Sequence, residues 1–133
     1  MPKMPTIASA MTPFPYFIEV DAHAAAAKAM MQQFKIHHLP VRDGDRIAGI
    51  ISELDLRRAQ AFGRDISSDS DIRALDICLR DVCVVDPDQP LDRVLSHMAG
   101  AQVDVVCVVK DGKLIGIYTY TDACRQFMEL LRT

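Results

Sequence analysis

Hydrophobic and polar positions follow the same succession of patterns twice along the chain. Each succession begins with a short apolar run and continues with apolar residues at helical spacing. Two apolar runs joined by a turn and a second helical stretch follow. The predicted strands are residues 17–20, 37–41 and 47–51 in the first copy and 82–85, 103–109 and 114–118 in the second. This order predicts an α+β fold made of two β-α-β-β-α repeats.

The predicted helices differ in composition between the two copies. In the second copy Pro90 suits the first helical turn. Four apolar residues follow it at positions i, i+3, i+4 and i+7, namely Leu91, Val94, Leu95 and Met98. In the first copy we expect a helix over residues 22–34, with Ala26, Ala29, Met30 and Gln33 on the matching stripe. The last helix is amphipathic, with an apolar side formed by Cys124, Phe127, Met128 and Leu131.

An internal repeat supports this interpretation. Residues 47–58 match residues 114–125 at an offset of 67, and the match includes a glycine, an isoleucine, an aspartate and the final arginine. Upstream, the turn dipeptides Asp43-Gly44 and Asp111-Gly112 also correspond. Residues 20–22 match residues 85–87 at an offset of 65, and small loop insertions would explain the drift.

The repeat sets the expected domain boundaries. Residues 7–62 form the first copy, residues 63–76 a polar linker rich in serine and aspartate, and residues 77–132 the second copy. One such unit cannot close its sheet alone. We therefore expect the two copies to pack with pseudo-two-fold symmetry and to leave two equivalent clefts between them.

The quoted segments resemble the cystathionine-β-synthase (CBS) domain family, whose members normally occur as a tandem pair called a Bateman module. Ala10-Met11-Thr12 with Pro15 resembles the opening element of the family, and Leu39-Pro40-Val41 its central strand. Residues 47–56 resemble its closing strand and helix. The second copy departs from this pattern with Ile77-Cys78-Leu79 and Cys107-Val108-Val109. The resemblance covers residues 7–132, and the chain is identified as a stand-alone CBS pair.

The resemblance implies a regulatory module that binds AMP, ADP, ATP or S-adenosylmethionine in the clefts between the copies. In the family the aspartate of the closing motif holds the ribose hydroxyls, and the hydroxyl residue three positions earlier lies near phosphate. These roles transfer to Asp55 and Ser52, and to Asp122 and Thr119. Thr12 matches a position that can contact ligand in the family, although it could also simply cap a turn.

Two histidines begin the predicted central strand of the first copy. Neighbouring residues in a strand point to opposite faces, so only one of His37 and His38 can line the first cleft. We choose His38, beside Pro40, and we expect no metal site at this pair.

The same site residues have structural alternatives. Ser52 with Asp55 and Thr119 with Asp122 have the spacing of capping boxes, which stabilise helix starts without any ligand. The two roles are compatible, because a capped helix start still offers free N–H groups and a dipole that favours phosphate. Arg58 could reach a ligand phosphate, as could Arg125 in the second copy. We favour the alternative that each arginine pairs with the aspartate three residues earlier.

Composition excludes several classes of protein. The 133 residues carry a net charge of −3 without a basic tract, which argues against a nucleic-acid binder. The apolar runs are far shorter than the roughly 20 residues needed to cross a membrane. The prolines at the N-terminus argue against a signal peptide. The four cysteines form no C-x-x-C pair and indicate buried free thiols in a reducing cytoplasm.

No catalytic or metal-binding motif is present in the sequence. We therefore expect a non-catalytic cytoplasmic regulator that requires no cofactor and senses energy status through an adenine nucleotide. We also expect a homodimer formed through the closing helices, and an unknown regulated protein as partner. The alternative is a ligandless scaffold for dimerisation and protein interaction, which the weakened second copy favours.

Overall fold

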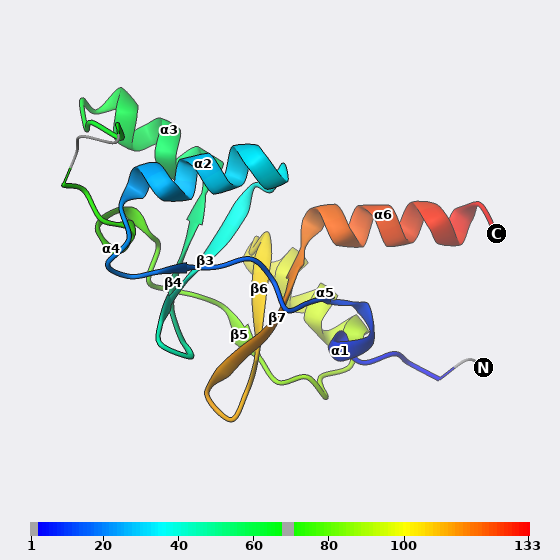
Figure 1. Ribbon diagram of the computed structural model, residues 1–133. Coiled ribbons are helices and arrows are strands. Elements are labelled where there is room, and N and C mark those ends of the chain that lie inside the picture. The colour runs from blue at the N-terminus through cyan, green and yellow to red at the C-terminus, as the bar shows by residue number, and fades with distance from the viewer. Residues whose placement is uncertain (1–2, 68–70) are drawn as a thin grey trace. The chain divides into compact units, whose positions relative to one another are not determined.

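The structure, a computed structural model, describes residues 3–67 and 71–133 and divides the chain into two compact units (Figure 1). The first unit comprises residues 16–82. The second unit combines the N-terminal residues up to Pro15 with residues 83–133. Each unit has its own sheet and its own hydrophobic core.

The first unit contains a three-stranded sheet in the order β2-β3-β4, with β2 parallel to β3 and β3 antiparallel to β4. Its elements are β2 (Ile18–Glu19), α2 (Ala24–Phe34), β3 (His38–Asp43), β4 (Arg46–Ser52), α3 (Glu53–Ala61) and α4 (Ala74–Ile77). The first five elements confirm the predicted β-α-β-β-α order.

Alternation along the strands explains the core of this unit. Leu39 and Val41 of β3 and Ile51 of β4 are fully buried, and they share one face of the sheet because successive strand residues point to opposite faces. Helix α2 covers that face with its own buried residues Ala24, Ala27 and Met31. Small alanines suit close packing of the helix on the sheet.

The second unit contains a four-stranded sheet in the order β1-β7-β6-β5. Its elements are α1 (Ile7–Ala10), β1 (Thr12–Pro13), β5 (Val84–Val85), α5 (Leu91–Ala101), β6 (Val105–Lys110), β7 (Lys113–Thr119) and α6 (Tyr120–Leu131). Its core is formed by Ile7, Val94, Met98, Val106, Val108 and Tyr118. From β5 to α6 the order is again β-α-β-β-α, as predicted.

The opening segment of each copy packs on the sheet of the other copy. In the second unit Thr12 of β1 lies opposite Ile117 of β7. In the first unit Leu79, 67 residues after Thr12, forms a bridge with Ile50 of β4. The repeats delimited at residues 7–62 and 77–132 therefore cut across both structural units.

The segment expected as a polar linker contributes to the first unit. Ile66 and Ala74 belong to its core, Ala74 within α4. Residues 68–70 of this segment lie outside the described residues. The serines and aspartates around Ile66 and Ala74 give the segment a polar composition, so composition alone did not indicate that these two residues are buried.

The structural offset between the copies is 67 residues throughout, from the opening segments to the closing helices. Ile18 lies opposite Val41, and Val85 lies opposite Val108. The predicted match of residues 20–22 with 85–87 at an offset of 65 is therefore wrong, and no loop insertion is needed.

This misalignment also displaced the predicted stripe on the first-copy helix. Ala26, Ala29 and Gln33 are exposed and Met30 is only half-buried, in place of the buried stripe predicted for them. The counterparts of Leu91, Val94 and Met98 at the true offset are the buried residues of α2.

The two hairpin turns also align differently from the prediction. The turn of the first unit is Gly44-Asp45, with a positive φ at Gly44, and that of the second is Asp111-Gly112, with positive φ at both residues. The glycine thus occupies the first turn position in one unit and the second in the other, so the dipeptides do not superpose.

The cysteines are free, but their burial differs from the expectation. Cys107 is buried and Cys78 and Cys83 are half-buried, whereas Cys124 on α6 is exposed. Within residues 3–67 and 71–133, no helix combines the length and the apolar character needed to cross a membrane.

Candidate functional site

A capping box joins β4 to α3 in the first unit. The Asp55 amide donates a hydrogen bond to Ser52 Oγ at 3.0 Å, and the Ser52 amide donates to Asp55 Oδ2 at 2.9 Å. Both side chains are half-buried. The capping role predicted from the spacing of these residues is confirmed.

A second capping box joins β7 to α6 at the equivalent position. The Asp122 amide donates to Thr119 Oγ1 at 3.3 Å, and the Thr119 amide donates to Asp122 Oδ2 at 2.9 Å. The Thr119 hydroxyl also donates to Asp122 Oδ2, at 3.1 Å. The carboxylate of Asp122 therefore has one interaction more than that of Asp55.

The arginines increase this difference. Arg125 Nη1 lies 3.5 Å from Asp122 Oδ1, so the predicted surface pair is confirmed in the second unit. Among the described residues, Arg58 forms no ion pair with Asp55. Asp122 is 8% exposed, and both of its oxygens are engaged within the chain. Oδ1 of the half-buried Asp55 is accordingly the more available acceptor.

His38 and Pro40 lie on the same sheet face as Ser52. His38 is directly opposite Ser52 across β3 and β4, and Pro40, two residues further, faces Ile50. The structure therefore brings His38, Pro40, Ser52 and the start of α3 together in one unit, on the face opposite Leu39 and its neighbours.

The second unit has different residues at these strand positions. Val105 lies opposite Thr119, and Cys107 lies opposite Ile117. Burial, with a smaller contribution from Cys83, raises the pKa of the Cys107 thiol to about 12, so the thiol remains protonated at neutral pH. The histidine and proline of the first unit are thus replaced by apolar or neutral groups.

Thr12 lies in the second unit, on β1. It stands opposite Ile117 on β1, and Thr119 follows two residues later on the same face of β7. Thr12 therefore belongs to the second unit, whereas Ser52 and Asp55 belong to the first, and a ligand contact of Thr12 stays a prediction.

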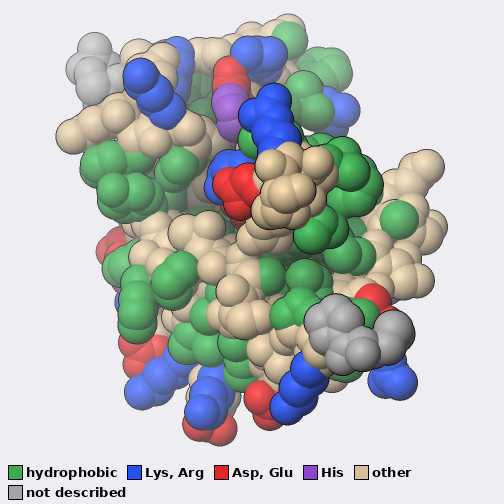
Figure 2. Space-filling model, turned by 90° about the vertical axis from the view of Figure 1, so that its right-hand side faces the viewer, with side chains coloured by type: hydrophobic (Ala, Val, Ile, Leu, Met, Phe, Trp, Pro, Cys, Tyr) green, Lys and Arg blue, Asp and Glu red, His purple; other side chains and the backbone are tan. Residues whose placement is uncertain are grey.

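Sequence reasoning missed a groove of about 410 Å³ in the first unit, between α2 and α3. Its charged lining includes Glu53, which accepts from Arg57 at 2.5 Å and lies 2.8 Å from Nδ1 of His37. The sequence signal was available, because Glu53 and Arg57 are four residues apart on one helix. Figure 2 shows charged side chains of both signs gathered around a histidine on the face that it presents.

No group of three or more histidine, cysteine or acidic side chains able to hold a metal ion occurs in the part of the chain that the structure describes.

The chain belongs to the CBS domain family. Two segments, residues 7–61 and 74–129, each match the model of the CBS domain. The geometry of two β-α-β-β-α units at a constant offset agrees with this assignment and with the resemblance noted in the sequence.

Solved structures agree with the assignment. A putative acetoin utilization protein (AcuB) from Vibrio cholerae is 26% identical, with a TM-score of 0.84 over 98% of this chain and 95% of that one. The CBS domain pair of protein MJ0100, solved in complex with 5′-methylthioadenosine and S-adenosyl-L-methionine, is 25% identical. Its TM-score is 0.79 over 92% of this chain and 98% of that one.

One curated relative that the chain matches is a much longer protein. The A-adding tRNA nucleotidyltransferase of Geobacter sulfurreducens is 25% identical over 99 residues. The match covers 74% of this chain but only 11% of that enzyme.

Proposed function

We propose that this CBS pair is a non-catalytic regulatory module of the cytoplasm that binds an adenosine-containing ligand and transmits binding as a conformational bias to a regulated protein. The ligand class comprises AMP, ADP, ATP and S-adenosylmethionine. A ligand that binds one conformation better than another shifts the population toward it, and a partner can read that shift.

The observation that carries the proposal is the carboxylate of Asp55 at a capped helix start, whose Oδ1 accepts no hydrogen bond from the described residues. Ser52 engages Oδ2, which leaves Oδ1 as an acceptor for a ribose hydroxyl. The N-terminus of α3 favours an anion such as phosphate. His38 and Pro40, on the same face as Ser52, supply a polar and an apolar neighbour.

The relative solved with 5′-methylthioadenosine and S-adenosyl-L-methionine supports the ligand class. Both of those molecules contain adenosine, so a ribose diol is the group they share with the nucleotides. We therefore assign Asp55 the ribose-binding role in the first unit. Asp122, with Thr119 and Thr12, is the weaker counterpart in the second unit.

Titration calorimetry with each nucleotide and S-adenosylmethionine tests the proposal on the full chain. Asp55→Asn keeps an acceptor for the cap but removes the charge. We expect it to weaken binding by about 1.5–3 kcal/mol, roughly ten- to a hundredfold, because a charge-assisted hydrogen bond is lost. Asp122→Asn should weaken binding less. Asp21→Asn, which removes the same charge from an exposed position, is the matched control and should leave affinity unchanged.

The outcomes separate the alternatives. Equal losses in Asp55→Asn and Asp21→Asn would show a general charge effect and contradict the ribose role. A larger loss in Asp122→Asn would move the ligand to the second unit. Absence of binding for every adenosine compound would favour the scaffold hypothesis.

The non-catalytic part of the proposal has its own test. With ATP we expect no turnover, because Ser52 and Thr119 are engaged as helix caps and the sequence supplies no recognised catalytic motif. Phosphate release that persists after repurification and is lost in Asp55→Ala would overturn this reading.

We also propose that the module forms a homodimer through α6. Phe127, Leu130 and Leu131 are 61%, 67% and 69% exposed in the single chain. Large apolar side chains grouped on one helix are typical of an association surface. Light scattering at micromolar concentration should give a dimer, and Leu131→Glu should give a monomer. Phe62→Glu, at an exposed position after α3, should leave the dimer intact.

A further inference from the structure

Two helices of the first unit line a groove that is separate from the Ser52–Asp55 site. Helix α2 contributes Lys28 and Met31, its C-cap residue Lys35 follows, and α3 contributes Glu53, Leu56 and Arg57. Lys28 and Met31 are three residues apart on α2, and Glu53, Leu56 and Arg57 share one stripe of α3, so the two stripes face a common space. Asp55 lies on a different side of α3 from Glu53 and Leu56, because two residues turn the chain by about 200° along a helix.

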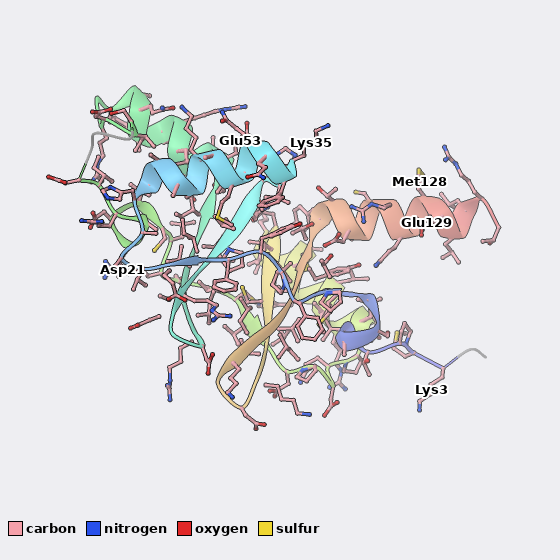
Figure 3. The ribbon with its side chains drawn as sticks, viewed as in Figure 1. Lys3, Asp21, Lys35, Glu53, Met128 and Glu129 are labelled. Atoms are coloured by element: carbon pink, nitrogen blue, oxygen red, sulfur yellow. The ribbon has the colours of Figure 1, made fainter. Side chains whose placement is uncertain are left out.

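The charges in this groove are not balanced. Glu53 is already held by Arg57 and His37, and these contacts, that with His37 first, lower the pKa of its carboxyl group. Lys28 and Lys35 form no ion pair among the described residues. Figure 3 shows Lys35 and Glu53 toward the C-terminal half of α2. Two ammonium groups therefore remain available beside a neutralised carboxylate.

The floor of the groove is apolar. Met31 and Leu56 are buried beneath the charged rim, and Ile36 is half-buried. The volume of about 410 Å³ lies within the range of small-molecule sites. An apolar floor with cations at its edge matches a molecule that has an apolar body and an anionic head.

The second unit lacks this combination at its equivalent positions. The counterparts of Lys28 and Arg57, 67 residues later, are Leu95 and Cys124, and the counterpart of Glu53 is Tyr120. The Tyr120 hydroxyl donates to the carbonyl oxygen of Met98 at 2.9 Å, so this side chain joins α5 to α6. The cationic rim is thus specific to the first unit and is no requirement of the shared fold.

We propose that the groove between α2 and α3 binds a small amphipathic anion, with its carboxylate or phosphate at Lys28 and Lys35 and its apolar body on Met31 and Leu56. This site is independent of the adenosine site, since it uses another face of α3.

An NMR titration of the isotopically labelled full chain tests the proposal with octanoate and octyl phosphate as probes. Octan-1-ol and octylammonium have a similar apolar body without the negative charge. We expect saturable shifts of the amides of Met31, Lys35, Ile36 and Leu56 with either anion and much weaker shifts with the other two. The ratio of the two anion affinities identifies the preferred head group.

Substitutions define the role of the two lysines. Lys28→Gln and Lys35→Gln should each raise the dissociation constant about fivefold, because each removes one cation from a partly exposed site. Lys110→Gln, at an exposed position of β6, is the matched control and should have no effect. Circular dichroism verifies that each variant remains folded.

Three results would overturn the proposal. Equal binding of octan-1-ol and octanoate would show that the charges play no role. Unchanged octanoate affinity in the Lys28→Gln, Lys35→Gln double variant would exclude the lysines. Absence of shifts up to about 10 mM probe, near the weak limit of measurable affinity, would show that the groove is not a ligand site. These three measurements concern only the groove, so their outcome does not depend on whether a nucleotide binds at Asp55.

Discussion

The helix pair α2 and α3 of the first unit and the helix pair α5 and α6 of the second unit have the same fold but surfaces of different chemical character. In the first unit lysine, arginine and glutamate side chains of α2, its C-cap and α3 surround the groove, together with His37 before β3. In the second unit α5 and α6 carry apolar side chains at the matching positions. The exposed ones are Leu95, Tyr120 and Phe127, the counterparts of Lys28, Glu53 and Gln60.

This difference shows that the fold constrains the inner stripe of each helix but not the outer one. Met31 and Met98 occupy the same buried position and are identical. On the outer stripe the charged residues Lys28 and Glu53 correspond to Leu95 and Tyr120, and the polar Gln60 corresponds to Phe127. The charged surface suits a soluble anion, and the apolar surface suits a second protein surface. Duplication therefore allows one scaffold to carry two kinds of recognition.

The largest expected effect concerns the glycines beneath the opening segments. A Cβ atom at Gly49 would lie 2.6 Å from the backbone oxygen of Leu79. The three atoms nearest to a Cβ atom at Gly116 all belong to the side chain of Met11, which is flexible and can rotate away. We expect Gly49→Ala to reduce the free energy of unfolding by about 2–3 kcal/mol, and Gly116→Ala by less than about 1 kcal/mol.

Urea denaturation of both variants measures these values. Met11→Ala combined with Gly116→Ala is the control, because it removes the side chain that the new methyl group would displace. Equal destabilisation by the two single glycine substitutions would show that the opening segments are held alike, contrary to the geometry.

The fold was predictable because its determinants are local. Alternating strands, the helical spacing after Pro90 and the repeated glycine and aspartate are all visible in the sequence. The capping boxes were predictable for the same reason, since Ser52 and Asp55 are only three residues apart. The alanine-rich helix was misaligned because most of its residues are alanine, so composition alone could not select Ala24 and Ala27 as the buried positions.

The crossing of the opening segments could not be read from local pattern. Thr12 pairs with Ile117, more than a hundred residues away, and no short-range signal specifies that partner. The groove was missed for a related reason. The groove forms only when α2 and α3 pack side by side. That packing depends on how β3 and β4, which lie between the two helices in the sequence, fold into a sheet.

Stability should rank the two capping aspartates in the reverse order from ligand affinity. Asp122 is buried and contacts Thr119 and Arg125, so Asp122→Ala should cost about 2 kcal/mol. Asp55→Ala should cost about 1 kcal/mol, the usual value of a cap. Thermal unfolding without ligand measures both. A greater loss in Asp55→Ala would contradict the assignment of Asp122 as the structural member of the pair.

The smallest expected effect is a pH dependence confined to the first unit. Glu53 accepts hydrogen bonds from His37 and Arg57, which lower the pKa of its carboxyl group below the ordinary value of 4.5. The unfolded chain therefore binds this proton more readily than the folded one. The stabilisation is fully present above the unfolded pKa and is lost as the pH falls through the folded pKa.

Glu53→Gln removes this term and tests it against its structural counterpart in the second unit. We expect the variant to be slightly less stable to heat than the unsubstituted chain at about pH 6, and we expect this difference to disappear at about pH 3. Tyr120→Phe removes a hydrogen bond of the second unit but no group that titrates in acid, so its deficit should be independent of pH over this range. If the loss of stability in Glu53→Gln were the same at the acid end, the glutamate would stabilise the fold through packing and not through its charge. The charged groove would then be stabilised in the same way as the apolar face of α5 and α6.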